Sequence, residues 1–122
     1  ALKTDNAQAQ EESGFCPNRG DVIWITFNPP TGSELYVRRP ALVLSPAEYN
    51  RRTGMALLCP ITRRVTGYPF EVLIPEGQRV DGAILADQVK SMDWQSRKAH
   101  FYCTLPAHVM HEVRGKLGVL LM

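Results

Sequence analysis

Hydrophobic and β-branched residues recur in short runs along most of this chain, and Pro, Gly and Asn separate the runs. They occupy residues 22–27, 41–44, 55–62, 70–74, 83–90 and 99–104. Short apolar runs bounded by turn residues are typical of β-strands. Several such strands in succession predict a small, strongly curved antiparallel sheet or β-barrel.

A short helix is predicted between the second and third of these runs. Ser45 is a suitable N-cap, Pro46 suits the first helical position, and Glu48 follows three residues after the cap. We expect the helix to cover residues 46–52 and to end near Gly54.

A second helix is predicted at the C-terminal end, beginning between residues 104 and 106. Its apolar positions recur at helical spacing and form one stripe, which comprises Val109, Val113 and Leu117 with Met110 and Leu120 beside it. Such a stripe has to pack against the sheet. The predicted fold class is therefore mainly β with α (α+β).

The length and composition predict one globular domain. A chain of 122 residues can bury about two-thirds of the surface that its unfolded form exposes. Apolar residues make up 44% and charged residues 21%, and no apolar run is long enough to span a membrane. Residues 1–18 are polar, so we expect an N-terminal extension at 1–18 and the domain at 19–122. We recognise no signal peptide.

Three cysteines, Cys16, Cys59 and Cys103, lie far apart in the sequence. Their odd number and spacing predict neither a disulfide framework nor a metal knuckle. We expect Cys59 and Cys103 to be small buried residues in strands and Cys16 to be an exposed free thiol. Free thiols are compatible with a reducing cytoplasm, where we expect the protein to act.

The positive charge is unevenly distributed, although the net charge is only +2. Basic residues occur as four doublets, namely Arg38-Arg39, Arg51-Arg52, Arg63-Arg64 and Arg97-Lys98. Doublets in separate loops could converge on one face and follow a phosphate backbone. They could equally be solvated loop charges, and composition alone leaves both interpretations open.

Several sequence blocks, in order and in register, resemble the MazF/PemK family of toxin endoribonucleases, and most closely its MazF-type members. The blocks are GDVIWITFNP at 20–29, GSE at 32–34, RRPALVLSP at 38–46, NRRTGM at 50–55, PIT at 60–62, GYPFEV at 67–72 and LADQVKS at 85–91. The resemblance covers residues 20–121. It implies an SH3-like or CcdB-type curved antiparallel β-barrel.

The same resemblance implies the toxin of a type II toxin–antitoxin system. Such a toxin is a metal-independent, sequence-specific endoribonuclease that cuts single-stranded RNA, including mRNA, and leaves 2′,3′-cyclic phosphate and 5′-OH ends. It implies a homodimer, and inhibition by a cognate MazE-like antitoxin whose acidic tail fills the RNA groove. We expect no metal and no cofactor, because the sequence contains no HExxH, no CxxC pair and no tight carboxylate cluster.

Three residues are candidates for catalysis. Arg39 offers a fork of donors that grips phosphate oxygens, and Pro40 restricts the backbone beside it. Thr62 could donate from a strand end, and the resemblance implies that Arg39 and Thr62 are the catalytic pair. Because an arginine with a pKa above ~12 is a poor proton acceptor, Glu34 on the same loop as Arg39 is a candidate base.

Further residues are candidates for contacting RNA. They are Arg38, Tyr36, Arg63, Arg64, Asp87, Gln88, Lys90 and Arg97. Tyr36 could stack a base, whereas Trp24 and Phe70 are expected in the core. Asp87 lies in an apolar strand and should find a polar partner, and PemK-type relatives use the aspartate at this place in catalysis. We expect a structural or RNA-contacting role for Asp87 and Gln88.

Two other functions compete with this interpretation. One is a CcdB-like toxin that binds DNA gyrase without cutting anything, and the other is a nucleic-acid-binding module without catalysis. CcdB-like toxins lack the pair that Arg39 and Thr62 form in this sequence, and a binding module without catalysis leaves Glu34 unexplained. Cleavage of RNA in the presence of EDTA distinguishes all three.

Overall fold

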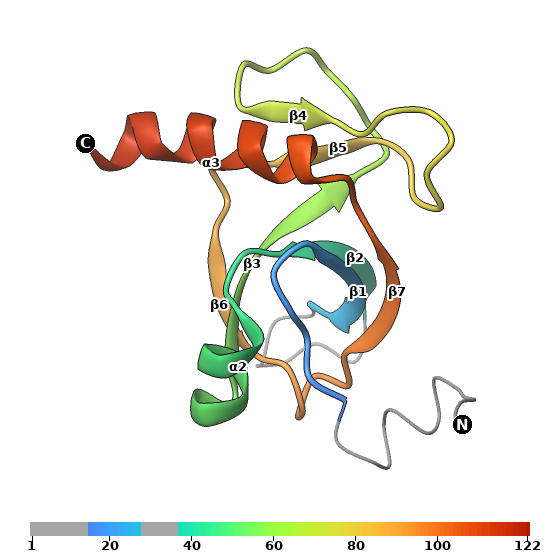
Figure 1. The fold of residues 1–122 in the computed structure, drawn as a ribbon. Helices are drawn as coiled ribbons and strands as arrows, with labels where there is room; N and C mark the ends of the chain where they lie inside the picture. The colour runs from blue at the N-terminus through green and yellow to red at the C-terminus, as the bar shows by residue number, and fades with distance from the viewer. Residues whose placement is uncertain (1–14, 28–36) are drawn as a thin grey trace.

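The computed structural model of the chain describes residues 15–27 and 37–122. Its described part contains seven strands and two helices (Figure 1). The strands are β1 (Asp21–Thr26), β2 (Arg38–Val43), β3 (Met55–Thr62), β4 (Glu71–Leu73), β5 (Ala83–Leu85), β6 (Lys90–Asp93) and β7 (His100–Thr104), and the helices are α2 (Ala47–Thr53) and α3 (Ala107–Leu121).

All strand pairs are antiparallel, and β3 is the centre of the sheet. The hydrogen-bonded order is β4-β5-β3-β2-β1-β7, and β6 also pairs with β3. The predicted class, mainly β with α, is confirmed. The barrel is not closed, because in the described part of the chain β4 pairs only with β5 and β7 only with β1. Helix α3 covers one end of the curved sheet instead (Figure 1).

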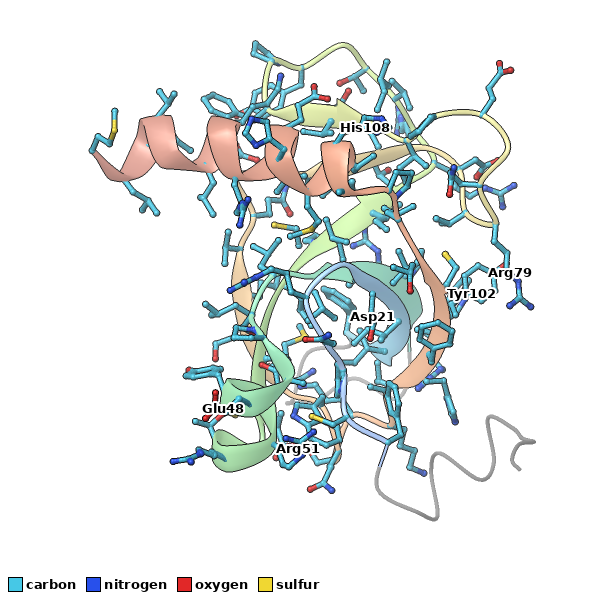
Figure 2. The ribbon with its side chains drawn as sticks, in the orientation of Figure 1. Asp21, Glu48, Arg51, Arg79, Tyr102 and His108 are labelled. Atoms are coloured by element: carbon cyan, nitrogen blue, oxygen red, sulfur yellow. The ribbon has the colours of Figure 1, made fainter. Side chains whose placement is uncertain are left out.

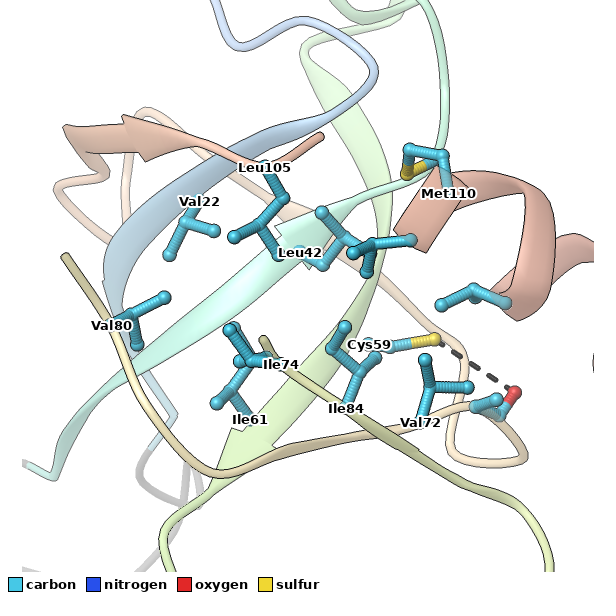
Figure 3. Close-up of a cluster of buried hydrophobic side chains, with 13 residues drawn as sticks. Val22, Leu42, Cys59, Ile61, Val72, Ile74, Val80, Ile84, Leu105 and Met110 are labelled. Carbon is cyan, nitrogen blue, oxygen red and sulfur yellow. Dashed lines mark hydrogen bonds between the residues drawn. The ribbon is translucent and has the colours of Figure 1, made fainter. Parts of the chain in front are cut away.

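The alternation of side chains along the strands creates two hydrophobic clusters. One face of β1 and β2 contributes Val22 and Leu42 to a cluster that also contains Val109 and Val113 of α3 (Figure 3). The opposite face contributes Ile23 and other residues to a second cluster, which Trp94 and Ala99 complete. Since both faces of these two strands are buried over part of their length, their positions are well determined by packing.

Helix α3 begins where the sequence predicts it and buries only part of the predicted stripe. Val109, Met110 and Val113 are buried. Leu117 is half-buried, and Leu120 is 49% exposed. The helix extends beyond the sheet in the direction of its C-terminus (Figure 1), and within residues 15–27 and 37–122 its last turn stays exposed.

Helix α2 ends as predicted but begins differently. Its N-cap is Pro46, without a side-chain hydrogen bond, and its C-cap is Gly54 in the left-handed conformation at φ 74°. The predicted cap, Ser45, instead donates from its hydroxyl to Oδ1 of the buried Asn50 (2.6 Å) and accepts from the N–H of Leu57 (2.9 Å). Ser45 therefore ties the helix to β3.

The three cysteines are free thiols. Cys59 is buried as predicted, and burial together with the charge of Asp87 raises its pKa to about 12. Cys103 is only half-buried, which departs from the prediction. Cys16 is also half-buried rather than exposed, because it packs against the second cluster beside Phe15.

The predicted division of the chain at residue 18, into an N-terminal extension and a domain, stays a prediction. None of the helices in the described ranges is long and apolar enough to cross a membrane.

Candidate active site

A groove of about 630 Å³ lies between the strands β1, β2 and β7, the end of β3 and the loop before β5. Its lining includes five arginines and one carboxylate, so its potential is positive. The lining residues are Trp24, Arg38, Arg39, Pro40, Ile61, Thr62, Arg63, Arg64, Gln78, Arg79, Val80, Asp81 and Tyr102. The fold thus brings together residues that are far apart in the sequence, including both members of the predicted catalytic pair.

Arg39 is positioned by β2, where it lies opposite Ile25 of β1. Its guanidinium carbon lies 5.4 Å from the centroid of the Phe27 ring, in a cation–π contact. No carboxylate in residues 15–27 or 37–122 forms an ion pair with Arg39. An arginine held by its neighbours in this way can present its donors to a phosphate.

Thr62 is the last residue of β3. Its Oγ1 accepts a hydrogen bond from the backbone N–H of Arg64 at 3.1 Å. That contact occupies a lone pair and leaves the hydroxyl proton available for donation to another oxygen. Thr62 is thus suited to donate to a phosphoryl oxygen in the groove.

The loop before β5 passes unusually close to Thr62. A Cβ at Gly82 would lie 2.0 Å from the carbonyl oxygen of Thr62, and the φ of Gly82 is +112°. The neighbouring residue Ala83 pairs with Thr62 in the sheet, and the carbonyl of Gly82 accepts from the N–H of Ile74 at 3.0 Å. Only glycine permits this approach.

We expect Gly82→Ala to destabilise the protein by more than about 1 kcal/mol, because alanine is strained at this φ and its methyl group collides with backbone. The collision has to move Thr62, so activity should fall further than stability alone explains. Thermal unfolding followed by circular dichroism, with cleavage measured well below the melting temperature, tests both effects. Gly77→Ala is the control, since it also has positive φ (+91°) but no atom within 4 Å of the added Cβ. Equal activity of the two variants would contradict the positioning role of Gly82.

Arg38 also lines the groove, and it is held by a dense set of hydrogen bonds. Its guanidinium donates to five acceptors, which are Oγ1 of Thr26 (2.9 Å), the carbonyls of Trp24 (3.1 Å), Arg97 (3.4 Å) and Lys98 (2.7 Å), and Nδ1 of His100 (2.9 Å). These acceptors belong to β1, to β7 and to the turn before β7. Arg38 therefore joins the two strands at one side of the groove.

The segment after Arg64 is anchored by Glu71, whose carboxylate accepts from the N–H and hydroxyl of Thr66 and from the N–H of Gly67. Burial would raise the pKa of Glu71, but these hydrogen bonds bring it below its ordinary value. Tyr68 of the same segment donates to Oδ2 of Asp87 at 2.6 Å, and this hydrogen bond raises the pKa of Tyr68. Asp87 thus has the polar partner that the sequence predicts, but it lies in the turn after β5 rather than in a strand.

Comparison with known proteins identifies the family of this chain. The family model of PemK-like, MazF-like toxins of type II toxin–antitoxin systems matches residues 18–121. The chain belongs to this family. The resemblance that the sequence blocks indicated is therefore confirmed.

Relatives of this toxin match it over most of its length. The endoribonuclease toxin MazF of Escherichia coli K12 is 46% identical over 109 residues, covering 89% of this chain and 97% of the relative. The endoribonuclease PemK of Escherichia coli is 30% identical over 108 residues, covering 84% and 80%. The crystal structure of MazF from Deinococcus radiodurans superposes with a TM-score of 0.80 at 52% identity, covering 87% and 96%. A MazE–MazF crystal structure from the same organism gives a TM-score of 0.83 at 52% identity, with the same coverage.

The structure places only some of the other predicted site residues in the groove. Arg63 and Arg64 line the groove, and Nε of Arg63 lies 3.6 Å from Oδ1 of Asp81, where both side chains are largely exposed. Four further residues are not among the lining residues, namely Asp87, Gln88, Lys90 and Arg97. Arg97 donates to the carbonyl of Thr26 at 3.0 Å. Glu34 and Tyr36 lie outside the described residues.

Several groove residues were not predicted from the sequence as site residues, among them Gln78, Arg79 and Tyr102. Trp24 was expected in the core, but it is half-buried and lines the groove. The alternation of β1 could have revealed Trp24, since it faces opposite to the buried Ile23 and Ile25. The other three come from a loop and from an irregular strand, for which alternation gives no signal.

Proposed function

We propose that this toxin cuts single-stranded RNA at specific sequences, without a metal ion, and leaves 2′,3′-cyclic phosphate and 5′-OH ends. The observation that carries the proposal is the presence of Arg39 and Thr62 in one positively charged groove. Their donors suit the oxygens of one phosphate. No group of three or more His, Cys, Asp or Glu side chains within the described ranges could hold a metal ion.

The predicted class, an endoribonuclease toxin of a toxin–antitoxin system, is confirmed by the family and by relatives that cover most of the chain. This finding does not favour the two competing functions. A CcdB-like gyrase-binding toxin and a module without catalysis would both leave the match to endoribonucleases unexplained.

The chemistry that we propose requires one bond to form and one to break. The ribose 2′-oxygen attacks the phosphorus and the bond from phosphorus to the 5′-oxygen breaks. The proton of the 2′-OH passes to a base, and the departing 5′-oxygen takes up a proton. Arg39 would neutralise charge on the phosphoryl oxygens and protonate the leaving oxygen, Thr62 would donate to a phosphoryl oxygen, and Glu34 would accept the first proton.

The remaining arginines of the groove would hold the RNA backbone. Arg63 and Arg64 are exposed beside Thr62, so they can reach phosphates on either side of the one that is cut. Arg38 is engaged with five protein acceptors, and we propose that it supports the groove as well as contributing charge. Asp87, Gln88, Lys90 and Arg97 stay candidates for RNA contacts beyond the groove.

The decisive experiment incubates the purified protein with a long RNA of mixed sequence in EDTA and maps the ends of the fragments. We expect discrete cleavage sites with 2′,3′-cyclic phosphate and 5′-OH termini. Fragments with 3′-OH termini, or cleavage that EDTA abolishes, would contradict the mechanism. Intact RNA would contradict the function itself.

Thr62→Val tests the donor role of Thr62, because valine keeps the shape and removes the hydroxyl. A hydrogen bond to a charged group contributes about 1.5–3 kcal/mol, so we expect kcat to fall by about 10- to 150-fold. The melting temperature should change little, since Thr62 is only half-buried. Thr104→Val is the matched control, because Thr104 is also the last residue of a strand and is not among the lining residues of the groove. Wild-type cleavage by Thr62→Val would leave Thr62 with a structural role only.

We further propose that the toxin is a cytoplasmic homodimer that a MazE-like antitoxin inhibits. The MazE–MazF structures of Deinococcus radiodurans support an antitoxin of this kind. The cytoplasm fits an RNA substrate and three free thiols.

A dimer interface at the C-terminal end of α3 is supported by an exposed apolar surface. Val119 is 66% exposed, Leu121 is 75% exposed and Met122 is fully exposed. A monomer seldom leaves such residues grouped at its surface. We expect light scattering at micromolar concentration to give the mass of a dimer, and Leu121→Glu to weaken it. A monomeric wild-type protein would contradict this prediction.

A further inference from the structure

A β-bulge in β7 directs Tyr102 into the groove. Along β1 and β7, Val22 pairs with Cys103 and the next residue, Ile23, pairs with Phe101, so Tyr102 is the extra residue. A bulge of this kind changes the direction of a side chain and is frequent beside active sites. The ring of Tyr102 lines the groove and contacts Trp24 edge to face, with centroids 5.9 Å apart.

Arg79 lies over the Tyr102 ring and is fastened to it by reciprocal hydrogen bonds. The guanidinium carbon lies 4.4 Å from the ring centroid, and Nη1 donates to the carbonyl of Tyr102 at 2.9 Å. The hydroxyl of Tyr102 donates in turn to the carbonyl of Arg79 at 3.3 Å. Figure 2 shows Arg79, from the loop between β4 and β5, beside Tyr102 of β7.

This arrangement leaves one face of a planar cation exposed in the groove. Arg79 is an exposed residue, and one face of its guanidinium covers the tyrosine, so the opposite face is open to solvent. Unpaired bases of RNA stack on arginine planes as well as on aromatic rings. Because the hydrogen bond from Nη1 and the contact with the ring hold the guanidinium in place, less side-chain freedom remains to be lost when a base binds.

We propose that Arg79, supported by Tyr102, forms a base-stacking subsite that receives one unpaired base of the RNA close to the scissile phosphate. The inference rests on the proposed function, since the subsite is in the same groove as Arg39 and Thr62. Stacking on a plane tolerates any base, so the subsite contributes affinity and register rather than the identity of a base.

The test uses an RNA oligonucleotide that contains a cleavage site mapped with the wild-type protein. A 2′-O-methyl group on the attacking ribose prevents cleavage, and an abasic nucleotide is placed at each position in turn. Fluorescence anisotropy gives the Kd for the wild type, Arg79→Ala, Arg79→Lys and Tyr102→Leu. Arg52→Ala is the control, because Arg52 is an exposed arginine of α2 outside the groove.

We expect one abasic position to weaken wild-type binding by at least about fivefold, which is the lower limit for the loss of one stacked base. Arg79→Ala and Tyr102→Leu should bind the intact oligonucleotide more weakly by a similar factor and lose the sensitivity at that position. Arg79→Lys keeps the charge without the plane, so it should lose the sensitivity while its salt dependence stays that of the wild type. Arg52→Ala should keep the wild-type pattern.

The subsite is overturned if Arg79→Ala keeps the full wild-type sensitivity at every abasic position, or if Arg79→Lys keeps it. The subsite is also overturned if Arg79→Ala binds RNA as tightly as the wild type and only its binding to the antitoxin is weaker. If the wild-type protein fails to cut the long RNA, the proposed function is refuted and the subsite with it. If the wild type cuts normally and Arg79→Ala keeps the wild-type sensitivity to abasic positions, the subsite alone is refuted.

Discussion

An Arg39→Ala variant is expected to cut RNA about a hundred- to a thousandfold more slowly than the wild type, which is the typical cost of removing one preorganised donor from the site of charge development. The arginine lies in the groove beside Thr62, and no carboxylate of the described ranges neutralises it. Its charge is therefore available to the phosphate until it gives its proton to the leaving oxygen.

The loss should not come from unfolding. Removing Arg39 deletes a cation–π contact with Phe27, and because both residues are half-buried this contact contributes about 0.5–2 kcal/mol. Single-turnover cleavage and thermal unfolding should be measured on Arg39→Ala, Arg39→Lys and the surface control Arg52→Ala. Near-wild-type cleavage by Arg39→Ala would refute the catalytic assignment, and rescue by lysine would show that charge matters more than the fork of donors.

Glu34→Gln is expected to lower the plateau of the cleavage rate by about a hundredfold or more, the usual contribution of a general base. A carboxylate with a pKa near its reference value of ~4.3 is deprotonated at neutral pH. The wild-type rate should therefore rise through mildly acidic pH and then level. The glutamine variant should bind RNA normally, because glutamine has the same size as glutamate.

The pH profile separates the two candidate bases. An arginine base, or solvent hydroxide, would make the wild-type rate rise log-linearly beyond pH ~9, since arginine keeps its proton up to about pH 12. That profile, together with normal cleavage by Glu34→Gln, would show that Glu34 is not the general base. Ser33→Ala, which changes the residue before Glu34 in the sequence, is the control.

The regular parts of this fold follow from the sequence, because strand alternation and turn residues are local signals. The runs at 22–27 and 55–62 correspond closely to β1 and β3. The predicted run at 83–90 contains only β5 and the first residue of β6, because residues 86–89 form the connection between them. The two strands pair with different parts of β3. A continuous apolar pattern does not show where the chain turns between two such strands.

The candidate site could be predicted only where a local motif or the family resemblance marked it. Arg39 and Thr62 stand in such motifs. The pairing of Arg79 with Tyr102 depends on a one-residue bulge in β7 and on the path of a loop, and neither has a local signature. At Ser45 a local motif was misleading. The sequence has an N-cap pattern there, but the hydroxyl of Ser45 donates to the buried Asn50 instead of capping the helix.

The central place of β3 has a consequence for local unfolding. Leu58 is paired with Val43 on one side and Lys90 on the other, and Ile61 pairs with Ile84. Amides in a strand with neighbours on both edges exchange with solvent only when most of the domain opens, whereas loops exchange through small fluctuations. The middle of β3, which carries Thr62 at its end, therefore belongs to the slowly exchanging part of the molecule, whereas Arg79 stands on a loop. The two walls of one groove thus differ in local stability, so hydrogen exchange can report on each wall separately.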